Sequence, residues 1–234
     1  TGYQSIDESA FQLLSRAEAL EIQSIDELSS FYPMEVIATR AETEALLQDH
    51  PNQPFLLFPE DRLYPIRMTD DLPYRWIEQG ANHLFKGSAA RGEYYPFQTG
   101  VFAARADLQP ISVIFSDLRN SAEQAVIPAA AFGCLNLSGV DWMGKKFQKE
   151  LPIPQGRIQA LWFGVQIPAD AAPGDYTGEL SVQAQGTEAQ KISIALNIQA
   201  EKIADHGDNL PERLSRLRWL DSTLALDDEV VAPF

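Results

Sequence analysis

The chain has 234 residues with 33 acidic and 18 basic side chains, a formal net charge of −15, and one cysteine. Its composition, 45% hydrophobic and 22% charged, is that of a globular domain, and the single thiol excludes a disulfide framework or a cysteine zinc site. The acidic charge repels phosphate backbones, which argues against nucleic acid as a partner. No apolar run approaches the roughly 20 residues of a membrane span.

Helix signals mark the first part of the chain. The pentapeptide Gln-Ser-Ile-Asp-Glu occurs at Gln4–Glu8 and Gln23–Glu27, and each copy holds a Ser-x-x-Glu capping box that starts a helix. The sequence around the copies does not repeat, which favours two independent helix starts over a duplication. A further helix is predicted at Ala41–Gln48, ending before Pro51. Short extended segments are predicted at Ala17–Gln23, Met34–Thr39, Pro54–Phe58 and Leu63–Met68, and a loop at Trp76–Gly92.

A series of β-strand patterns begins at Glu93. Valine, isoleucine and aromatic residues are enriched, between turn signals, at Tyr94–Arg105, Ile111–Ser116, Gln124–Leu137, Arg157–Ile167, Asp175–Gln185 and Lys191–Ile198. In the last of these segments apolar and more polar residues alternate strictly, which is typical of a strand with one buried face. Repeated short strands at this spacing predict a mainly β fold, an antiparallel β-sandwich of immunoglobulin-like type with a few short N-terminal helices.

Tyr176 follows a Pro-Gly-Asp turn and directly precedes an alternating strand. Immunoglobulin-type sandwiches place a tyrosine at such a corner, where its hydroxyl bonds to the backbone a few residues upstream. We therefore predict a structural tyrosine corner at Tyr176. An aromatic side chain that simply lies on a strand face is the alternative.

Motifs that could carry chemistry are weak. Gly139–Lys146 matches seven places of a phosphate loop, but a lysine occupies the place of the magnesium-binding hydroxyl, so a hairpin loop is the better interpretation. His206 lies between aspartates in a turn that favours capping over cation binding. Cys134 lies in an apolar strand and is predicted to be structural. The many carboxylates are expected to be surface acids, and no metal, cofactor or catalytic residue is predicted.

Aromatic residues in or beside the predicted loops are candidates for stacking on sugar rings. These are Trp142, Trp76, Tyr94 and Tyr95. Packing in the core or at an interface is the alternative for each ring. Trp142, between two strands, is the strongest candidate, and glycan is therefore a candidate partner.

Six stretches of sequence resemble the amino-terminal region of large exported bacterial glycoside hydrolase-like proteins, and are similar to glycoside hydrolase family 123. They are Ser30–Ala38, Leu56–Arg62, Tyr64–Met68, Gln159–Pro168, Pro173–Gly178 and Ser215–Thr223. The resemblance runs from about Arg16 to Phe234. Characterised members of the family are β-N-acetylgalactosaminidases in which a β-sandwich precedes a (β/α)-barrel. That barrel holds a catalytic Asp-Glu pair, which acts with the N-acetyl group of the substrate.

The resemblance implies a non-catalytic accessory sandwich at residues 1–203, with a helix-containing part at 1–90 and the clearest strands at 93–199. It implies that residues 204–234 lead to a C-terminal catalytic domain of the same chain, and that the parent is a secreted, periplasmic or cell-surface enzyme. Thr1 is not an initiator methionine, and the stretch Leu220–Phe234 stops on apolar residues without a capping or turn signal, so we expect the chain to be part of a longer protein. Predicted contacts with that domain are Arg216, Arg218, Trp219 and Asp221.

Two other functions remain open from the sequence. A stand-alone carbohydrate-binding module would need a solvent-facing aromatic platform and would bind glycan by itself. A structural cell-surface sandwich would show neither glycan affinity nor a catalytic partner in the same chain.

Overall fold

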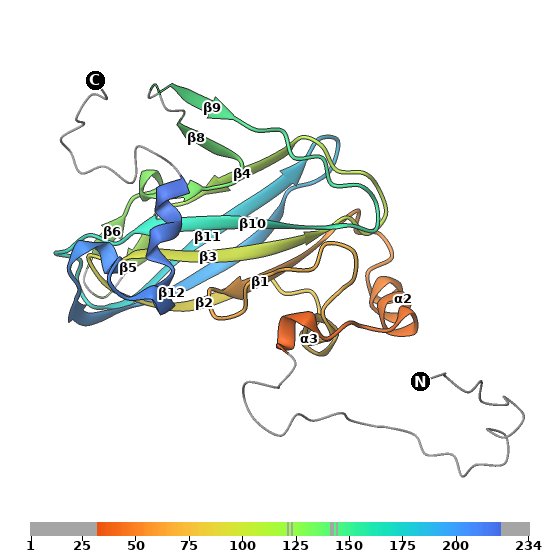
Figure 1. Cartoon of the computed structure of the whole chain (residues 1–234), viewed down its shortest axis with the longest axis horizontal. Helices are drawn as coiled ribbons and strands as arrows, with labels where there is room; N and C mark the ends of the chain where they lie inside the picture. Colours follow the sequence, from red (N-terminus) through yellow and green to blue (C-terminus); the bar gives the residue numbers. More distant parts are fainter. Residues whose placement is uncertain (1–31, 121, 123, 141–142, 144, 221–234) are drawn as a thin grey trace, which may run out of the picture. The chain divides into compact units, whose positions relative to one another are not determined.

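The computed structural model describes residues 32–120, 122, 124–140, 143 and 145–220. The chain divides into two units, Thr1–Tyr32 and Pro33–Phe234, and the fold described is that of the second. The predicted helix starts at Gln4–Glu8 and Gln23–Glu27 and the predicted strand at Ala17–Gln23 lie outside the described residues. The second unit is mainly β, and its described residues form two main sheets, a two-stranded hairpin and a few short helices (Figure 1).

The smaller of the two sheets has the strand order β1-β3-β10-β7. Its strands are β1 (Leu56–Asp61), β3 (Tyr94–Phe102), β10 (Ile158–Gln166) and β7 (Phe132–Cys134). Each neighbouring pair is antiparallel. Every residue of β3 is buried, so this central strand is covered on both faces.

The larger sheet has the order β2-β12-β11-β5-β6, and β4 pairs with β11 beside β5. Its strands are β2 (Leu84–Arg91), β12 (Gln190–Lys202), β11 (Gly174–Ala184), β5 (Leu118–Asn120), β6 (Ala125–Ile127) and β4 (Ile111–Phe115). Its pairs are antiparallel except that β2 runs parallel to β12. A separate hairpin joins β8 (Ser138–Val140) to β9 (Lys146–Gln148), as the hairpin interpretation of this segment predicts.

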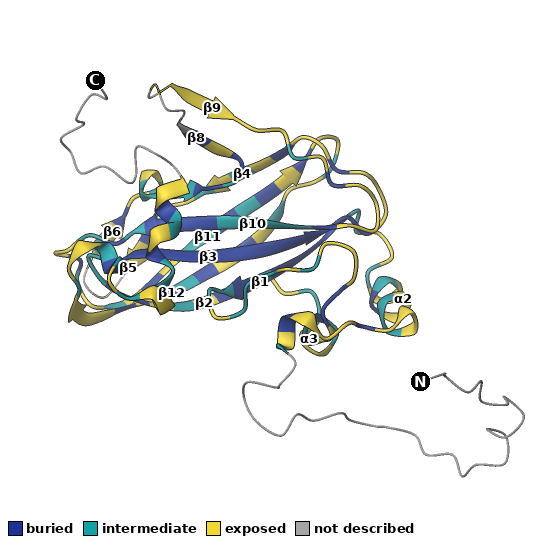
Figure 2. Cartoon of the chain, in the orientation of Figure 1, coloured by how far each residue is buried: buried dark blue, intermediate teal, exposed yellow. Residues whose placement is uncertain are grey.

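One hydrophobic cluster joins the two sheets. Phe97 and Phe163 contribute from the smaller sheet, and Leu180 and Ile194 from the larger. Alternation along β12 buries Ile192, Ile194, Leu196 and Ile198 and exposes most of the residues between them (Figure 2). The prediction of a mainly β chain with antiparallel sheets in a sandwich-like arrangement is therefore confirmed.

Most of the α and 3-10 helices before the last strand lie in the first part of the described chain, before and after β1. They are η1 (Pro33–Glu35), α2 (Arg40–Asp49) and α3 (Tyr74–Gln79), and η2 (Ala129–Ala131) follows later. The predicted helix at Ala41–Gln48 is confirmed as α2. Its start carries a capping box, in which the Glu42 amide donates to Thr39 Oγ1 at 3.3 Å and the Thr39 amide donates to Glu42 Oε2 at 2.7 Å.

Local predictions are wrong at three places, two of which contain short helices. Met34–Thr39 forms the turn η1 and one isolated bridge, between Ile37 and Pro73, in place of a strand. Trp76–Gly92 holds most of α3 and all of β2 in place of a loop. β2 contains glycine, serine and alanines, and its pairing with the distant β12 depends on a register that local sequence cannot reveal.

The other extended segments are close to their predicted positions, with two exceptions. Leu63–Met68 contains no strand, and Gln124–Leu137 is divided into β6, η2 and β7. The tyrosine corner is confirmed, since the buried Tyr176 donates from its hydroxyl to the carbonyl oxygen of Ala172 at 2.9 Å. None of the helices in the described ranges has the length and apolar character needed to cross a bilayer.

Candidate functional site

The segment that follows β12 is folded against the sandwich by three turns of 3-10 helix. These are η3 (Asp205–Gly207), η4 (Pro211–Arg213) and η5 (Ser215–Leu220), and we call residues 205–220 the connector. The residues of η3 have positive backbone φ angles, and Leu214, also at a positive φ, separates η4 from η5. The last turn, η5, contacts β3 of the smaller sheet.

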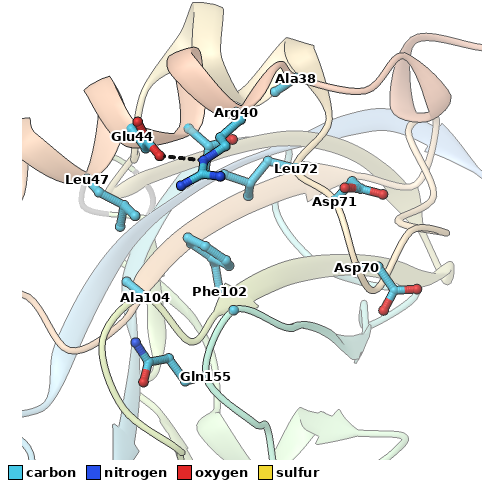
Figure 3. A pocket seen from close by; sticks show the side chains of 12 residues that line it. Ala38, Arg40, Glu44, Leu47, Asp70, Asp71, Leu72, Phe102, Ala104 and Gln155 are labelled. Atoms are coloured by element: carbon cyan, nitrogen blue, oxygen red, sulfur yellow. Dashed lines mark hydrogen bonds and ion pairs between the residues drawn. The ribbon is translucent and has the colours of Figure 1, made fainter.

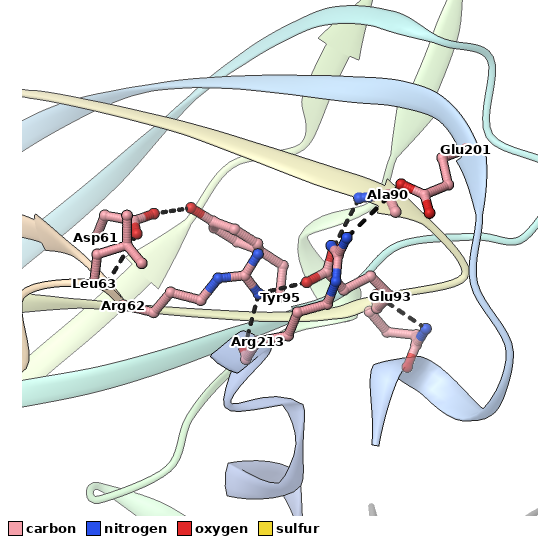
Figure 4. Close-up of polar contacts among 9 residues, drawn as sticks. Asp61, Arg62, Leu63, Ala90, Glu93, Tyr95, Glu201 and Arg213 are labelled. Carbon is pink, nitrogen blue, oxygen red and sulfur yellow. Dashed lines mark hydrogen bonds and ion pairs between the residues drawn. The ribbon is translucent and has the colours of Figure 1, made fainter. Parts of the chain in front are cut away.

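A buried carboxylate anchors the connector to the sandwich. Glu93 directly precedes β3, next to Gly92, which has a φ of 79° and whose missing side chain leaves room for the carbonyl oxygen of Ile203. The Glu93 side chain is 0% exposed and forms ion pairs with Arg62 and with Arg213, the latter at 2.8 Å (Figure 4). Its Oε2 also accepts the amide of Ala90 at 2.7 Å. We call Arg62, Glu93 and Arg213 the ion cluster.

Arg62 connects the two sides of this ion cluster. Its Nη1 also donates to the carbonyl oxygen of Arg213 at 2.8 Å, so it binds both the sandwich and the backbone of the connector. Its guanidinium carbon lies 4.5 Å from the ring centroid of Tyr95. The Tyr95 hydroxyl donates to Asp61 (Figure 4), and burial, followed by the nearby Asp61 charge, raises the pKa of this hydroxyl. Tyr95 is therefore a protonated hydrogen-bond donor across the physiological pH range.

A second ion pair closes the connector on itself. Arg218 Nη2 lies 2.6 Å from Asp208 Oδ2, and the two side chains are 8% and 13% exposed. Arg216 Nε donates to the carbonyl oxygen of Asp208 at 2.7 Å. Two of the residues predicted to contact a further domain, Arg216 and Arg218, thus bind Asp208 of their own connector. Asp208 is also one of the two aspartates of the His206 turn, and this contact gives it a structural role.

Apolar side chains remain exposed at the end of the connector. Trp219 is 50% and Leu220 69% exposed, and the Arg216 guanidinium carbon lies 5.4 Å from the Trp219 ring centroid. Asp221, the fourth predicted contact residue, lies outside the described part of the chain. The connector therefore has a fixed inner side and an apolar outer end.

Three of the four aromatic candidates for sugar binding are buried, so the sugar-binding hypothesis is wrong for these rings and the alternative of packing in the core holds. Trp76 is in α3, Tyr94 and Tyr95 are in β3, and none is more than 3% exposed. Each ring occupies space that a glycine leaves free: Trp76 lies on Gly100, Tyr94 on Gly164 and Tyr95 on Gly87. The fourth candidate, Trp142, lies outside the described residues.

Trp76 is also held by polar contacts. Its indole Nε1 donates to Glu60 at 3.0 Å, and its ring stacks on Phe58 with centroids 4.4 Å apart. Arg75 forms an ion pair with the same Glu60 at 3.0 Å. Burial raises the pKa of the Glu60 carboxyl, and the hydrogen bond and charge of Arg75 oppose that change in part. These contacts assign Trp76 to the packing of α3 on the smaller sheet.

Hollows open on the surface of the described part of the sandwich, and two of them adjoin residues discussed above. One, of about 580 Å³, lies between α2, the segment around Asp70 and Asp71, and the end of β3 (Figure 3). Phe102 lies at its base but is only 5% exposed, so it offers little of its ring face to a ligand. The other, of about 550 Å³, adjoins the ion cluster and is lined by Arg62, Lys86 and Arg213 among others.

The remaining chemical candidates have structural positions. Cys134 is buried in β7, and burial raises the pKa of its thiol to about 12, so the prediction of a structural cysteine is confirmed. Asp205 Oδ2 accepts a hydrogen bond from the side-chain amide of Asn209 at 3.2 Å, a contact between side chains and not the backbone capping bond that the sequence favoured. Within the described residues, no group of three or more histidine, cysteine, aspartate or glutamate side chains is arranged to hold a metal ion.

Comparison of the sequence with known protein families and with curated proteins finds no match. Solved structures show distant similarity. A family 123 glycoside hydrolase from Clostridium perfringens, studied for glycolipid glycan hydrolysis, has 16% identity and a TM-score of 0.47 over 62% of this chain and 27% of its own. An endo-fucoidan hydrolase of glycoside hydrolase family 107 has 6% identity and a TM-score of 0.29 over 51% of this chain and 13% of its own.

A third structure, the N-terminal domain of PorA, has 12% identity and a TM-score of 0.34 over 51% of this chain and 90% of its own. The chain thus has distant structural similarity to parts of two glycoside hydrolases. It spans less than a third of the length of either one.

Proposed function

We propose that the chain is the non-catalytic accessory sandwich of a secreted, glycoside hydrolase-like protein, and that its connector orients a following (β/α)-barrel domain that carries the chemistry. In this proposal residues 1–203 are the sandwich domain and residues 204–234 lead to the barrel. Hydrolysis of a glycan is the activity of the parent protein, whose location is extracellular, periplasmic or on the cell surface.

The observation that carries the proposal is the ion cluster of Arg62, Glu93 and Arg213. Burying three charges has a large desolvation cost, and a hydrophobic replacement of similar volume is often as stable. A gain in stability therefore does not account for the ion cluster, and its clearest effect is the geometry that it imposes on the connector. It fixes the direction in which the chain leaves the sandwich, which a flexible tether between independent domains would not require.

The outer end of the connector supports the same function. Trp219 and Leu220 are exposed apolar side chains next to residues that are held by buried ion pairs. Tryptophan and arginine are enriched where protein surfaces meet, and here the Arg216 guanidinium lies near the Trp219 ring. The resemblance to the amino-terminal region of glycoside hydrolase-like proteins includes this same stretch, Ser215–Thr223.

Calorimetry on the longer protein tests the proposal. If the connector joins two domains, Trp219→Ala should separate or lower the melting transition of the following domain and leave that of the sandwich within a degree or so. Tyr74→Ala, at a ring that is 38% exposed elsewhere on the sandwich, is the matched control and should change neither transition. Identical melting of both domains in the wild type and in Trp219→Ala would contradict the proposal.

A stand-alone carbohydrate-binding module is the alternative that the sequence leaves open, with a structural surface sandwich as a further one. Burial of Trp76, Tyr94 and Tyr95 removes three of the four rings on which the binding alternative depends. Affinity electrophoresis of the chain through host-type and plant glycans distinguishes the functions. We expect unretarded migration, whereas retardation by one glycan would favour the binding module.

A further inference from the structure

Two strand edges face each other on one side of the sandwich. β7 ends the smaller sheet, and β4 pairs with β11 in the larger one. Between them lies a hollow of about 250 Å³ that is independent of the connector. Its lining includes Val113 and Phe115 of β4, Phe132 and Cys134 of β7, and Gln148 of β9.

The edge of β4 presents backbone groups to this hollow. The Ser116 amide donates to Glu179 O at 2.9 Å and the Gln185 amide donates to Pro110 O at 3.2 Å, at the two ends of the β4–β11 ladder. In an antiparallel pair, alternate residues direct both backbone groups toward the partner strand. The even-numbered residues of β4 therefore bond to β11, and Val113 and Phe115 direct their N–H and C=O groups toward the free edge.

β4 lacks the features that usually protect an edge strand. Its sequence, Ile-Ser-Val-Ile-Phe, has no charge and no proline, and Ile114 is 68% exposed. Natural edge strands are commonly blocked by lysine, proline, a bulge or a covering loop. Val113, Phe115 and Phe132 are partly buried hydrophobic residues packed against the core, so an added strand would find both backbone partners and an apolar surface.

Positive charge lies beside the hollow. Gln148 lines it, and Lys146 lies on the same face of β9 because side chains alternate along a strand. The amide of Lys149 donates to the carbonyl oxygen of Leu137, another lining residue, at 2.7 Å, while its side-chain nitrogen lies 5.6 Å from the ring centroid of Phe147 and so adds positive charge near the hollow without lining it. Both lysine side chains are exposed. A second copy of the chain would carry the same net charge of −15 and the same lysines at this edge, so the two copies would repel each other. The local positive charge therefore favours an acidic segment of a different protein.

We propose that β4 binds an extended acidic peptide segment of a partner protein by strand addition. The segment would pair with the free edge of Val113 and Phe115, place alternate apolar side chains in the hollow, and set its carboxylates against Lys146, with Lys149 adding to the positive charge nearby. Main-chain hydrogen bonds would provide affinity, and the hollow and the lysines would provide selectivity.

Amide hydrogen exchange on the whole chain tests this inference. The probe is a synthetic peptide of three valines alternating with two threonines, flanked on each side by two aspartates. At a peptide concentration of about 1 mM, exchange of the Val113 and Phe115 amides should slow at least about tenfold. The Ile114 amide bonds to β11 and should change little. The same peptide with lysines in place of the aspartates is the matched control and should protect these amides less.

Variants on both partners separate the backbone and charge contributions. Lys146→Glu with Lys149→Glu should weaken binding of the acidic peptide about tenfold and strengthen binding of the basic one. Val113→Pro removes an edge N–H that does not bond to β11, and should abolish protection of Phe115 by the peptide. If this variant does not fold, N-methylation of the peptide amides that face β4 makes the same test from the other side.

Three results would overturn the inference. The first is that neither peptide protects the edge amides at about 1 mM. The second is that the acidic and basic peptides protect them equally. The third is that these amides are already protected in the free chain. Protection that rises with protein concentration would mean that a second copy covers the edge. Protection that is independent of concentration would mean that another part of the same chain covers it.

Discussion

The hydroxyl of Tyr176 donates to the carbonyl oxygen of Ala172, four residues earlier, at 2.9 Å. Tyr176 is 1% exposed and begins the buried pattern of β11, so this bond fixes the turn from which the central strand of the larger sheet starts. The local sequence predicts this corner because turn, ring and acceptor lie within a few residues of each other.

Tyr176→Phe should lower the free energy of unfolding by about 1 kcal/mol or more, because it removes a buried hydrogen bond and leaves the Ala172 carbonyl without this donor. Urea denaturation of the two proteins measures the difference. Tyr74→Phe, at a ring that is 38% exposed, should stay within about 0.5 kcal/mol of the wild type. Equal stabilities for wild type and Tyr176→Phe would contradict the assignment of Tyr176 as a structural tyrosine corner.

Glu93→Gln should be among the most destabilising polar substitutions in the chain. It leaves Arg62 and Arg213 without their buried counter-charge, and breaking such a pair costs roughly 3 kcal/mol. The matched control is Glu44→Gln in the exposed pair with Arg40, which should change stability by less than about 1 kcal/mol. Denaturant titration followed by circular dichroism compares them, and similar losses for the two variants would show that the ion cluster has no special role.

Gly100→Ala should destabilise the packing of α3 on the smaller sheet. An added Cβ would overlap the Trp76 ring, with Cζ2 at 2.8 Å, so ring or strand must shift. Overpacking of this kind costs typically about 1–3 kcal/mol. Gly133→Ala, where nothing lies within 4 Å of the added carbon, is the control and should be nearly neutral. Thermal melting and tryptophan fluorescence report on both, and an unchanged Gly100→Ala protein would contradict the packing assignment.

The buried Glu60 should give stability a pH dependence. Its raised pKa, caused first by burial, means that the folded chain holds this proton more tightly than the unfolded chain. Its contribution to stability is therefore complete below the unfolded pKa of about 4.3 and is lost as pH rises through the higher folded pKa. Relative to wild type, Glu60→Gln should become more stable as pH rises through this window. Urea titrations at several pH values test the sign, and a trend in the opposite direction would refute it.

The elements predicted correctly are those whose pattern is local. β12 alternates over its own residues, and α2 consists of helix-forming residues before a proline. β2 was missed because its small residues make room for other groups: Gly87 lies against Tyr95, and the strand pairs with β12, far along the chain. Trp76 was predicted to lie in a loop because the space that receives its ring is left by Gly100, which belongs to a strand further along the chain.

The ion cluster could not be found by spacing, since Arg62, Glu93 and Arg213 come from distant segments. One signal was present: a glutamate directly after a glycine turn, just before a strand that is almost entirely uncharged. In the folded chain this carboxylate is fully buried, and a buried carboxylate requires a counter-charge or hydrogen bonds. Which arginines serve as those cations is settled by tertiary structure alone.

The accessory-domain proposal is tested most directly by reading the coding region past the codon for Phe234. The account predicts an open frame that continues for roughly 250 residues or more, with alternating strand and helix patterns of a (β/α)-barrel. Such a frame would also provide the longer protein for the Trp219→Ala experiment. A frame that stops within a few codons would contradict the proposal, and the glycan-binding assay would then decide between the remaining functions.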